Sequence, residues 1–188
     1  NLKCTYCVPS CGTTSSLPYP ELMTFDEMLR IIRVAARHGL NKVRITGGEP
    51  LVRRGVVDFV ANLSKIEGIR DIAMTTNGVL LRNYAKDLKK AGLKRLNISL
   101  DTFDPEKFAI ITKGDCFEKV WEGILEAERV GFEPLKINTV VTRGANDHEV
   151  IDFAKMTLTR KVQCRFIEFM PVDDWDLWKK QFVSKAEM

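Results

Sequence analysis

Three cysteines stand close together at the start of this sequence, and their spacing points to metal chemistry. Cys4, Cys7 and Cys11 fall within eleven residues, and a loop rich in Gly, Ser and Thr continues to residue 16. A Cys-x-x-Cys pair fits a zinc half-site, a thioredoxin-type redox pair or part of an iron–sulfur loop. A redox pair should open a helix, whereas Cys7 is followed by Val8 and Pro9. An irregular cluster-binding loop is therefore the interpretation that fits best.

The other candidate metal ligands lie far from this loop. The two histidines, His38 and His148, fall in helical contexts where we expect solvent-facing side chains, so zinc is the weaker choice. Cys116 and Cys164 are isolated in sequence, and we expect them to be small buried residues. An odd number of cysteines with three clustered argues against a secreted disulfide framework and indicates a reducing compartment.

A second motif, Thr46-Gly47-Gly48-Glu49-Pro50, stands where the first predicted strand ends. Paired glycines let the backbone approach a ligand closely and adopt φ angles that other residues avoid. Exposed backbone carbonyls there could accept hydrogen bonds from a ligand ammonium group, with Glu49 in support. The alternative is a plain strand-to-helix turn. The upstream cysteine loop makes a ligand site the more specific interpretation.

One structural unit repeats about every thirty residues from Thr24 onward: an amphipathic helix, a glycine and a short β-rich run. Thr24 and Glu27 form the capping box of the first helix, and Gly39 ends it. The predicted strands cover residues 42–46, end at residues 76 and 100, and then cover residues 135–141 and 163–169. Alternation of helix and strand predicts an α/β fold with a parallel sheet.

Alternate strand positions carry polar side chains in all five runs. These positions are Arg44, Thr46, Thr75, Asn77, Asn97, Ser99, Asp101, Lys136, Asn138 and Arg165. A sheet covered by helices on both faces would have nearly continuous apolar strands. The polar stripe therefore favours a wide partial barrel with its site inside. The alternative is that these residues cap the helices that follow the strands.

Composition limits the classes of partner. The chain has 188 residues, of which 45% are hydrophobic and 29% are charged, and no apolar run is long enough to cross a bilayer. A net charge of +4 is too small and too evenly spread to indicate nucleic-acid binding, but it suits an anionic small molecule. We expect no nucleic acid and no membrane among the partners. Because the sequence begins with Asn1 and not with Met, we also expect a processed or truncated start.

Residues 1–9 together with residues 44–50 resemble the radical S-adenosylmethionine (SAM) superfamily. That family uses Cys-x-x-x-Cys-x-x-Cys, whose thiolates hold three irons of a 4Fe-4S cluster and leave the fourth iron for SAM. Cys4 and Cys7 match the second and third cysteines, and the first belongs just before Asn1. Cys11 is an alternative ligand, but Tyr6 lies between Cys4 and Cys7 as the family pattern requires, which favours the upstream cysteine. The resemblance implies a partial (β/α)6 TIM-type barrel whose first strand is missing, with residues 1–188 as one incomplete core domain.

Four further segments, residues 42–54, 75–78, 97–102 and 165–171, extend the likeness to the GTP 3',8-cyclase family over essentially the whole chain. The resemblance implies that a 4Fe-4S cluster and SAM are the cofactors. It implies SAM contacts for Tyr6, Gly48, Asn77, Ser99 and Met170, and GTP contacts for Lys42, Arg44, Thr75, Lys136 and Arg165. A triphosphate inside a barrel needs several cations, and Arg44, Lys136 and Arg165 fall on three strands of the predicted inner face.

The resemblance also implies a reaction. A 5'-deoxyadenosyl radical would remove the ribose 3' hydrogen of GTP, and the carbon radical would close onto guanine C8, the first step of molybdenum cofactor synthesis. The implied partners are GTP, a reductant for the cluster and, as one option, a second copy of the chain, in a bacterial cytoplasm or a mitochondrial matrix. The family's second three-cysteine cluster has no counterpart after Cys164, so we expect this chain alone to fold without turnover.

Two alternatives stay open. One is another radical SAM enzyme that acts on a different anionic substrate. The other is a cluster-free relative that retains only nucleotide binding. No general acid or base can be assigned from the sequence, and Asp101 and Glu168 could equally be structural.

Overall fold

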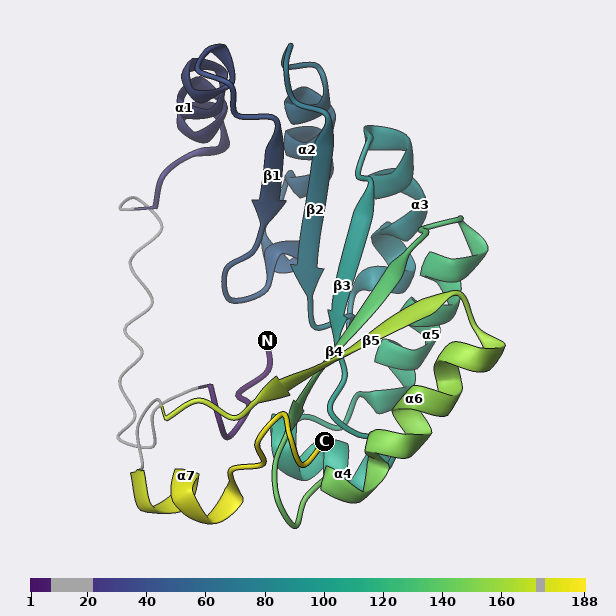
Figure 1. The fold of residues 1–188 in the computed structure, drawn as a ribbon. Coiled ribbons are helices and arrows are strands. Elements are labelled where there is room, and N and C mark those ends of the chain that lie inside the picture. The colour runs from purple at the N-terminus through teal and green to yellow at the C-terminus, as the bar shows by residue number, and fades with distance from the viewer. Residues whose placement is uncertain (8–21, 172–174) are drawn as a thin grey trace.

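Five parallel strands form one sheet in the order β1-β2-β3-β4-β5 (Figure 1). The computed structural model describes residues 1–7, 22–171 and 175–188. The strands are β1 (Lys42–Ile45), β2 (Asp71–Thr76), β3 (Arg95–Ser99), β4 (Leu135–Val141) and β5 (Val162–Glu168). Each predicted strand is confirmed to within a few residues. Sequential strands are neighbours throughout, as right-handed β-α-β connections produce.

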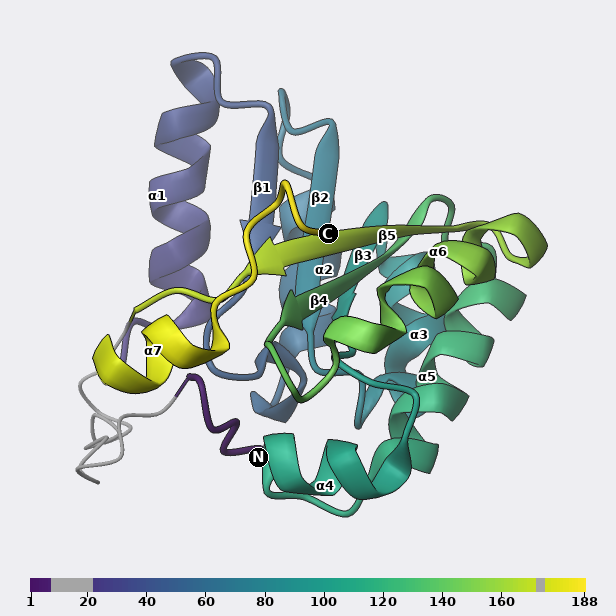
Figure 2. The same cartoon turned by 60° about the horizontal axis from the view of Figure 1, so that its bottom comes forward.

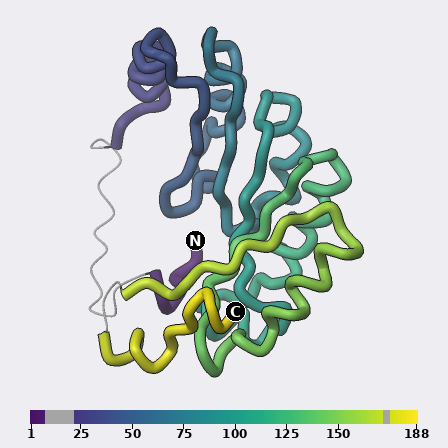
Figure 3. Tube along the Cα trace, in the orientation of Figure 1, coloured from purple at the N-terminus to yellow at the C-terminus, as the bar shows by residue number. Residues whose placement is uncertain are grey.

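Helices cover one face of this sheet and leave the other face open. The helices are α1 (Phe25–Arg37), α2 (Val56–Ser64), α3 (Leu81–Ala91), α4 (Pro105–Thr112), α5 (Phe117–Arg129), α6 (Val150–Thr159) and α7 (Trp175–Gln181), with short 3₁₀ helices η2 (Pro50–Val52) and η3 (Asp147–Glu149). The sheet curves so that α2, α3, α5 and α6 lie on its convex side, while the N-terminal segment and α7 lie near the ends of the strands (Figures 1 and 3). One-sided coverage confirms the partial barrel and excludes an open sheet with helices on both faces.

The repeating units begin and end where local chemistry dictates. The Thr24 hydroxyl accepts a hydrogen bond from the Glu27 amide at 3.2 Å, and the Glu27 carboxylate accepts one from the Thr24 amide at 2.7 Å. This reciprocal pair is the predicted capping box of α1. Gly92 ends α3 with a φ of +105°, in the left-handed region that favours glycine.

Helix α4 was not among the predicted elements. Asp104 caps it, because one carboxylate oxygen accepts hydrogen bonds from the amides of Glu106 at 2.9 Å and Lys107 at 3.2 Å. Pro105 occupies its first turn, where the missing amide hydrogen costs nothing. The Asp-Pro pair is a start signal present in the sequence, and α4 contacts the segment that carries Cys4 and Cys7.

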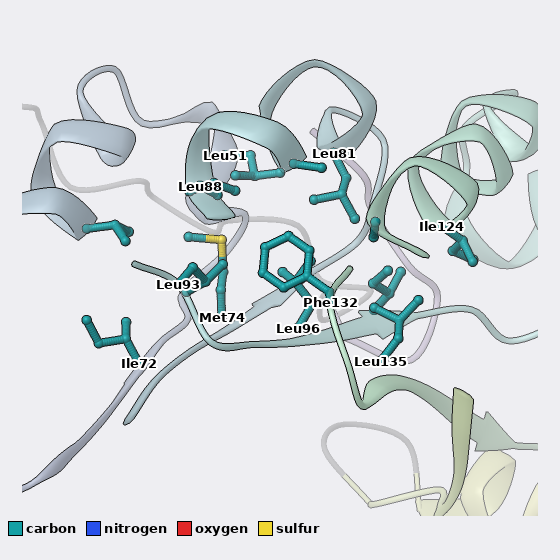
Figure 4. Close-up of a cluster of buried hydrophobic side chains, with 14 of the residues drawn as sticks. Leu51, Ile72, Met74, Leu81, Leu88, Leu93, Leu96, Ile124, Phe132 and Leu135 are labelled. Carbon is teal, nitrogen blue, oxygen red and sulfur yellow. The ribbon is translucent and has the colours of Figure 1, made fainter. Parts of the chain in front are cut away.

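The hydrophobic core lies between the convex face of the sheet and the helices (Figure 4). Met74, Leu96 and Leu135 from neighbouring strands pack with Leu88 and Ile124 from α3 and α5, and all five are fully buried. Each such side chain contributes about 1.5–3 kcal/mol through removal from water. The strand positions that alternate with these residues must point to the opposite, concave side.

Several smaller expectations can be compared with the structure. Cys116 and Cys164 pack against the core but are half-buried, which is less burial than predicted, whereas His38 and His148 are exposed, as predicted. Within the described segments no helix is both long and apolar enough to cross a membrane. The prediction for Cys11 falls outside the residues that the structure describes.

Candidate functional site

Strand register places the predicted polar residues in rows across the concave face. Thr75 pairs with Asn97, and Asn97 pairs with Lys136, so these three side chains lie side by side. Two residues further along, Ser99 pairs with Asn138, which in turn pairs with Arg165. Because parallel neighbours in register point the same way, the concave face is polar from β2 to β5.

A cleft of about 320 Å³ opens where β1, β2 and β3 end, within the range of about 300–1,000 Å³ typical of small-molecule sites. Its lining includes Cys4, Cys7, Tyr6, Gly48, Asn77 and Ser99, so it unites the two predicted cluster ligands with four of the five residues predicted to contact SAM. Thr75, predicted to face GTP, also lines it. Two larger clefts, of about 470 and 570 Å³, lie elsewhere and contain no cysteine and no concave-face residue in their lining.

The glycine loop after β1 forms one wall of this cleft. Gly47 has a φ of +149°, which disfavours any other residue, and no heavy atom of the described residues lies within 4 Å of the position that a Cβ on Gly48 would occupy. The Glu49 carboxylate accepts hydrogen bonds from the Thr76 hydroxyl at 2.7 Å and the Asn77 amide at 2.7 Å. Glu49 therefore supports the site indirectly, because its carboxylate ties the loop to the end of β2.

Asn77 combines two roles that sequence reasoning treated as alternatives. Its side-chain oxygen accepts a hydrogen bond from the Val79 amide at 3.1 Å, as a strand-end cap would. Its side-chain nitrogen donates to the Asn1 side-chain oxygen at 2.8 Å, within the lining of the cleft. The cap interpretation therefore holds for Asn77 without removing it from the site.

Helix α4 holds the N-terminal segment against the sheet (Figure 2). The amide of Lys3 donates to the Thr112 carbonyl at 3.0 Å, and the amide of Thr5 donates to the Ile111 carbonyl at 2.9 Å. These carbonyls belong to the last turn of α4, whose carbonyl groups lack partners within the helix. The end of α4 thus serves as the docking point for the segment that carries the cysteines.

Cys4 and Cys7 stand on one tight turn, in which the Cys7 amide donates to the Cys4 carbonyl at 3.0 Å. Between them, the Tyr6 hydroxyl donates to an Asp101 carboxylate oxygen at 2.6 Å. Burial raises the pKa of Cys4 to about 11, and the negative charge of Asp101 adds to the effect. Burial also raises the pKa of Asp101 to about 6, against hydrogen bonds from Tyr6 and the Val140 amide that lower it. Without metal Cys4 is a neutral thiol, and an iron ligand must lose that proton.

In the described part of the chain, the thiols of Cys4 and Cys7 are the candidate ligands of a cluster. Across residues 1–7, 22–171 and 175–188, no three His, Cys, Asp or Glu side chains converge to hold a metal ion. Cys4 and Cys7 line the same cleft as the glycine loop and fit two of the three thiolates of a radical SAM cluster. The open space beside Gly48 fits a ligand that approaches the backbone closely.

Cations gather on the concave face beyond the cleft. Lys136 keeps only 8% of its surface exposed, and its pKa is lowered by burial and then by the charges of Arg165, Arg95 and Arg44. Asp71 opposes this shift and accepts a hydrogen bond from Arg95 Nε at 2.9 Å. The predicted residues Arg44 and Arg165 therefore lie close enough to Lys136 to disfavour its positive charge, and a bound polyanion would relieve this repulsion.

Not every predicted residue reaches the cleft, and sequence reasoning missed Arg95 on this face and assigned no role to Asn138. Lys42 pairs with Asp71 in the sheet, and Met170 follows β5 with 65% of its surface exposed, outside the lining. Arg95 was missed, although it lies two residues before Asn97 in β3. Asn138 was recognised as polar but not assigned to the site; its buried side-chain oxygen has no hydrogen-bond partner among the described residues.

Comparison with known proteins identifies relatives of this chain. The chain is 51% identical to the GTP 3',8-cyclase of Thermodesulfovibrio yellowstonii, over 100% of this chain and 58% of that protein. It is 47% identical to the GTP 3',8-cyclase of Alkaliphilus metalliredigens, over 100% of this chain and 59% of that protein. The chain thus spans a little under three fifths of these relatives.

Solved structures share the fold at low sequence identity. Streptococcus suis SuiB bound to S-adenosylmethionine superposes with a TM-score of 0.73 at 19% identity, over 92% of this chain and 37% of that one. The maturase HydG gives a TM-score of 0.67 at 13% identity, over 89% of this chain and 41% of that one. These matches support the partial barrel as the fold.

The family model settles the membership. The model described as the Radical SAM superfamily matches residues 1–157, which include the cysteine turn, the glycine loop and β1 to β4. A 4Fe-4S cluster and SAM are the cofactors of this family, and the thiols and the glycine cleft provide for both. Because the match covers most of its length, this chain belongs to the radical SAM superfamily.

Proposed function

We propose that this chain forms the barrel of a GTP 3',8-cyclase, with SAM in the glycine cleft and GTP against the neighbouring cations. Relatives that are 51% and 47% identical over the whole chain carry that name. The observation that carries the proposal is the convergence of Arg44, Lys136 and Arg165 on the same concave face as the cysteine cleft. A radical formed in the cleft would then be next to a bound nucleoside triphosphate.

Two parts of the chain would hold the cofactors. Cys4 and Cys7 would bind two irons of the cluster, and the backbone at Gly48 would lie against SAM, whose further contacts are Tyr6, Asn77 and Ser99. When bound, the cluster and SAM supply a 5'-deoxyadenosyl radical that removes the ribose 3' hydrogen of GTP. The chain itself aligns the two ligands and keeps water from the reacting atoms. The SAM contact of Met170 stays a prediction.

The cation group suits a triphosphate for reasons of charge and geometry. Arginine binds phosphate oxygens through two parallel hydrogen bonds, and lysine adds a compact charge. The lowered pKa of Lys136 reflects burial and the repulsion of its neighbours, and bound phosphate would reverse the second cause. Lys42 and Thr75 flank this group on β1 and β2 and complete the proposed GTP contacts. The Asn138 side-chain oxygen, which has no partner among the described residues, lies on the same face and could accept a hydrogen bond from a ligand.

The remaining assignments follow from this proposal. Residues 1–188 act as one radical SAM core domain. A reductant supplies the electrons, and a homodimer stays a prediction. Free cysteines throughout the described residues suit a reducing compartment, the bacterial cytoplasm or the mitochondrial matrix.

The test uses the protein that contains this chain, with its cluster reconstituted without oxygen, and GTP deuterated at ribose C3'. With SAM and a chemical reductant, we expect deuterium in 5'-deoxyadenosine and a cyclised nucleotide, both measured by mass spectrometry. Lys136→Met and Arg165→Met should weaken GTP use without lowering the iron content.

Each other outcome points to one alternative. Formation of 5'-deoxyadenosine without deuterium and without cyclised product would indicate a radical SAM enzyme for another anionic substrate. Failure to bind a cluster, with GTP binding retained, would indicate a cluster-free nucleotide-binding relative.

A further inference from the structure

We propose that Asp101 is a positioning residue that holds the cysteine segment, residues 1–7, over the glycine loop through the Tyr6 hydroxyl. The contact joins residues 95 positions apart in sequence at 2.6 Å. Its importance for catalysis rests on the proposed function, but the positioning itself does not. Neither residue has to react for this role, because the hydrogen bond only needs to orient the turn between Cys4 and Cys7.

Asp101 is held in place by β4 and the loop that follows it. One carboxylate oxygen accepts a hydrogen bond from the Val140 amide at 2.8 Å. The Asn146 side-chain nitrogen donates to the Asp101 carbonyl at 2.6 Å and to the Val140 carbonyl at 2.8 Å. Only the second carboxylate oxygen remains, and this is the atom that accepts the Tyr6 hydroxyl. The acceptor is thus preorganised, so little freedom is lost when Tyr6 binds it.

A second buried acid braces the residues directly after Asp101. Glu149, with 7% of its surface exposed, accepts hydrogen bonds from the Thr102 hydroxyl at 2.7 Å and the Phe103 amide at 2.8 Å. Asn146, with 2% exposed, precedes it on the same β4–α6 connection. Two buried polar side chains of one loop therefore fix the loop that presents Asp101. Such fully satisfied networks define a single arrangement of the chain.

Among the described residues of the N-terminal segment, Tyr6 lies on the Cys4–Cys7 turn and holds it to the rest of the protein through a side-chain hydrogen bond. The other hydrogen bonds between this segment and the rest of the described protein come from the amides of Lys3 and Thr5 to α4 and from the side chain of Asn77 to that of Asn1. The α4 contacts fix the path of the backbone, but they leave the turn free to rotate about that path. The Tyr6 hydroxyl removes this freedom and sets how the thiols face Gly48.

Tyr6→Phe tests this role because it removes only the hydroxyl. In the metal-free chain we expect amide hydrogen exchange of residues 1–7 to accelerate at least about fivefold, since the segment opens more often. Alkylation of Cys4 by iodoacetamide should also accelerate. Together with faster hydrogen exchange, faster alkylation reports greater exposure of the thiol.

Further variants separate positioning from general damage. Asp101→Ala should have the same effect on exchange, and the double variant should be no worse than either single one because both remove one contact. Asp101→Asn should restore much of the protection, since its amide can still accept from Val140 and donate to the Tyr6 oxygen. Tyr84→Phe and Asp152→Asn are matched controls away from the segment and should behave as wild type. If Asp101→Ala fails to fold, the hydrogen exchange of Tyr6→Phe and Asp101→Asn provides the test.

The reconstituted protein provides the second readout. With Tyr6→Phe we expect unchanged iron content, but about ten times more SAM should be needed to change the electron paramagnetic resonance spectrum of the reduced cluster. If Tyr6→Phe matches the wild type in hydrogen exchange, in alkylation rate and in its response to SAM, the proposal is wrong. If the wild-type protein does not cyclise GTP but Tyr6→Phe still shows the expected effects, the proposed function is wrong and the positioning role stands.

Discussion

Gly48 tests the location of the SAM site because a side chain at this position would meet none of the described residues. A Cβ there would have no heavy atom of residues 1–7, 22–171 or 175–188 within 4 Å, and the φ of Gly48 lies outside the left-handed region. Gly48→Ala should therefore fold normally. Reduced freedom of the unfolded chain should raise the free energy of unfolding by about 0.4–1 kcal/mol.

The same methyl group should interfere with SAM. Gly48 lines the cleft together with Cys4 and Ser99, where the proposal places the ligand. Overpacking at a filled site costs about 1–3 kcal/mol, which corresponds to a loss of affinity of about 5- to 150-fold. Equilibrium binding of SAM to the reconstituted protein measures this loss, and urea unfolding of the metal-free chain measures the stability.

Gly123→Ala is the matched control, because it should lower the stability of the fold and leave the affinity for SAM unchanged. Gly123 lies inside α5, and a Cβ there would stand 2.7 Å from the Gly78 carbonyl oxygen and 3.0 Å from Leu81 Cβ. Better helix propensity contributes about 1 kcal/mol, but overpacking costs about 1–3 kcal/mol. We expect a loss of up to about 2 kcal/mol in the free energy of unfolding and unchanged affinity for SAM. If Gly48→Ala binds SAM as tightly as wild type, the ligand does not approach this backbone and the assignment of the cleft is wrong.

Three further predictions concern charges and hydrogen bonds. Asp71→Asn should lower the free energy of unfolding by about 1–3 kcal/mol, because Arg95 loses its charged partner. The loss, measured by urea unfolding, should be larger at low salt. An equal loss at all salt concentrations would contradict this explanation. Asn138→Ala should leave stability nearly unchanged but weaken GTP binding about 2- to 10-fold, measured by calorimetry, since the Asn138 oxygen has no partner among the described residues and can accept from a ligand. Glu187, whose pKa is lowered to about 2 by the Ser184 amide and Arg143, should stabilise the fold fully above its ordinary 4.5 and lose this effect as pH falls towards 2. Thermal unfolding of Glu187→Gln should therefore differ from wild type at pH 6 and match it near pH 2.

The repeating part of the fold could be predicted because its periodicity is strong. Alternation along β2 and β3 separates buried Met74 and Leu96 from polar Thr75 and Asn97, and the structure confirms both faces. Helix α4 was missed because it has only eight residues, and its cap at Asp104 was the one clear signal. The short helix α7 was missed as well.

The site could be predicted only in part, because contacts between distant elements are not encoded in local patterns. Tyr6, Gly48 and Ser99 were found from motifs and line one cleft. The pairing of Arg95 with Asp71 depends on the register between β2 and β3, which alternation within one strand does not define. Likewise, no local rule predicts that Asp101 contacts Tyr6 across most of the chain.

The docking of the N-terminal segment on α4 also sets an order of events during synthesis. Its backbone partners Ile111 and Thr112 and its side-chain partner Asp101 are made about a hundred residues after Lys3 and Thr5. At about 5–20 residues per second, the ribosome needs roughly 5–20 s to reach them. During that interval Cys4 has no surface to dock on. Insertion of a cluster in the docked arrangement is therefore a late step, which follows formation of the middle of the sheet.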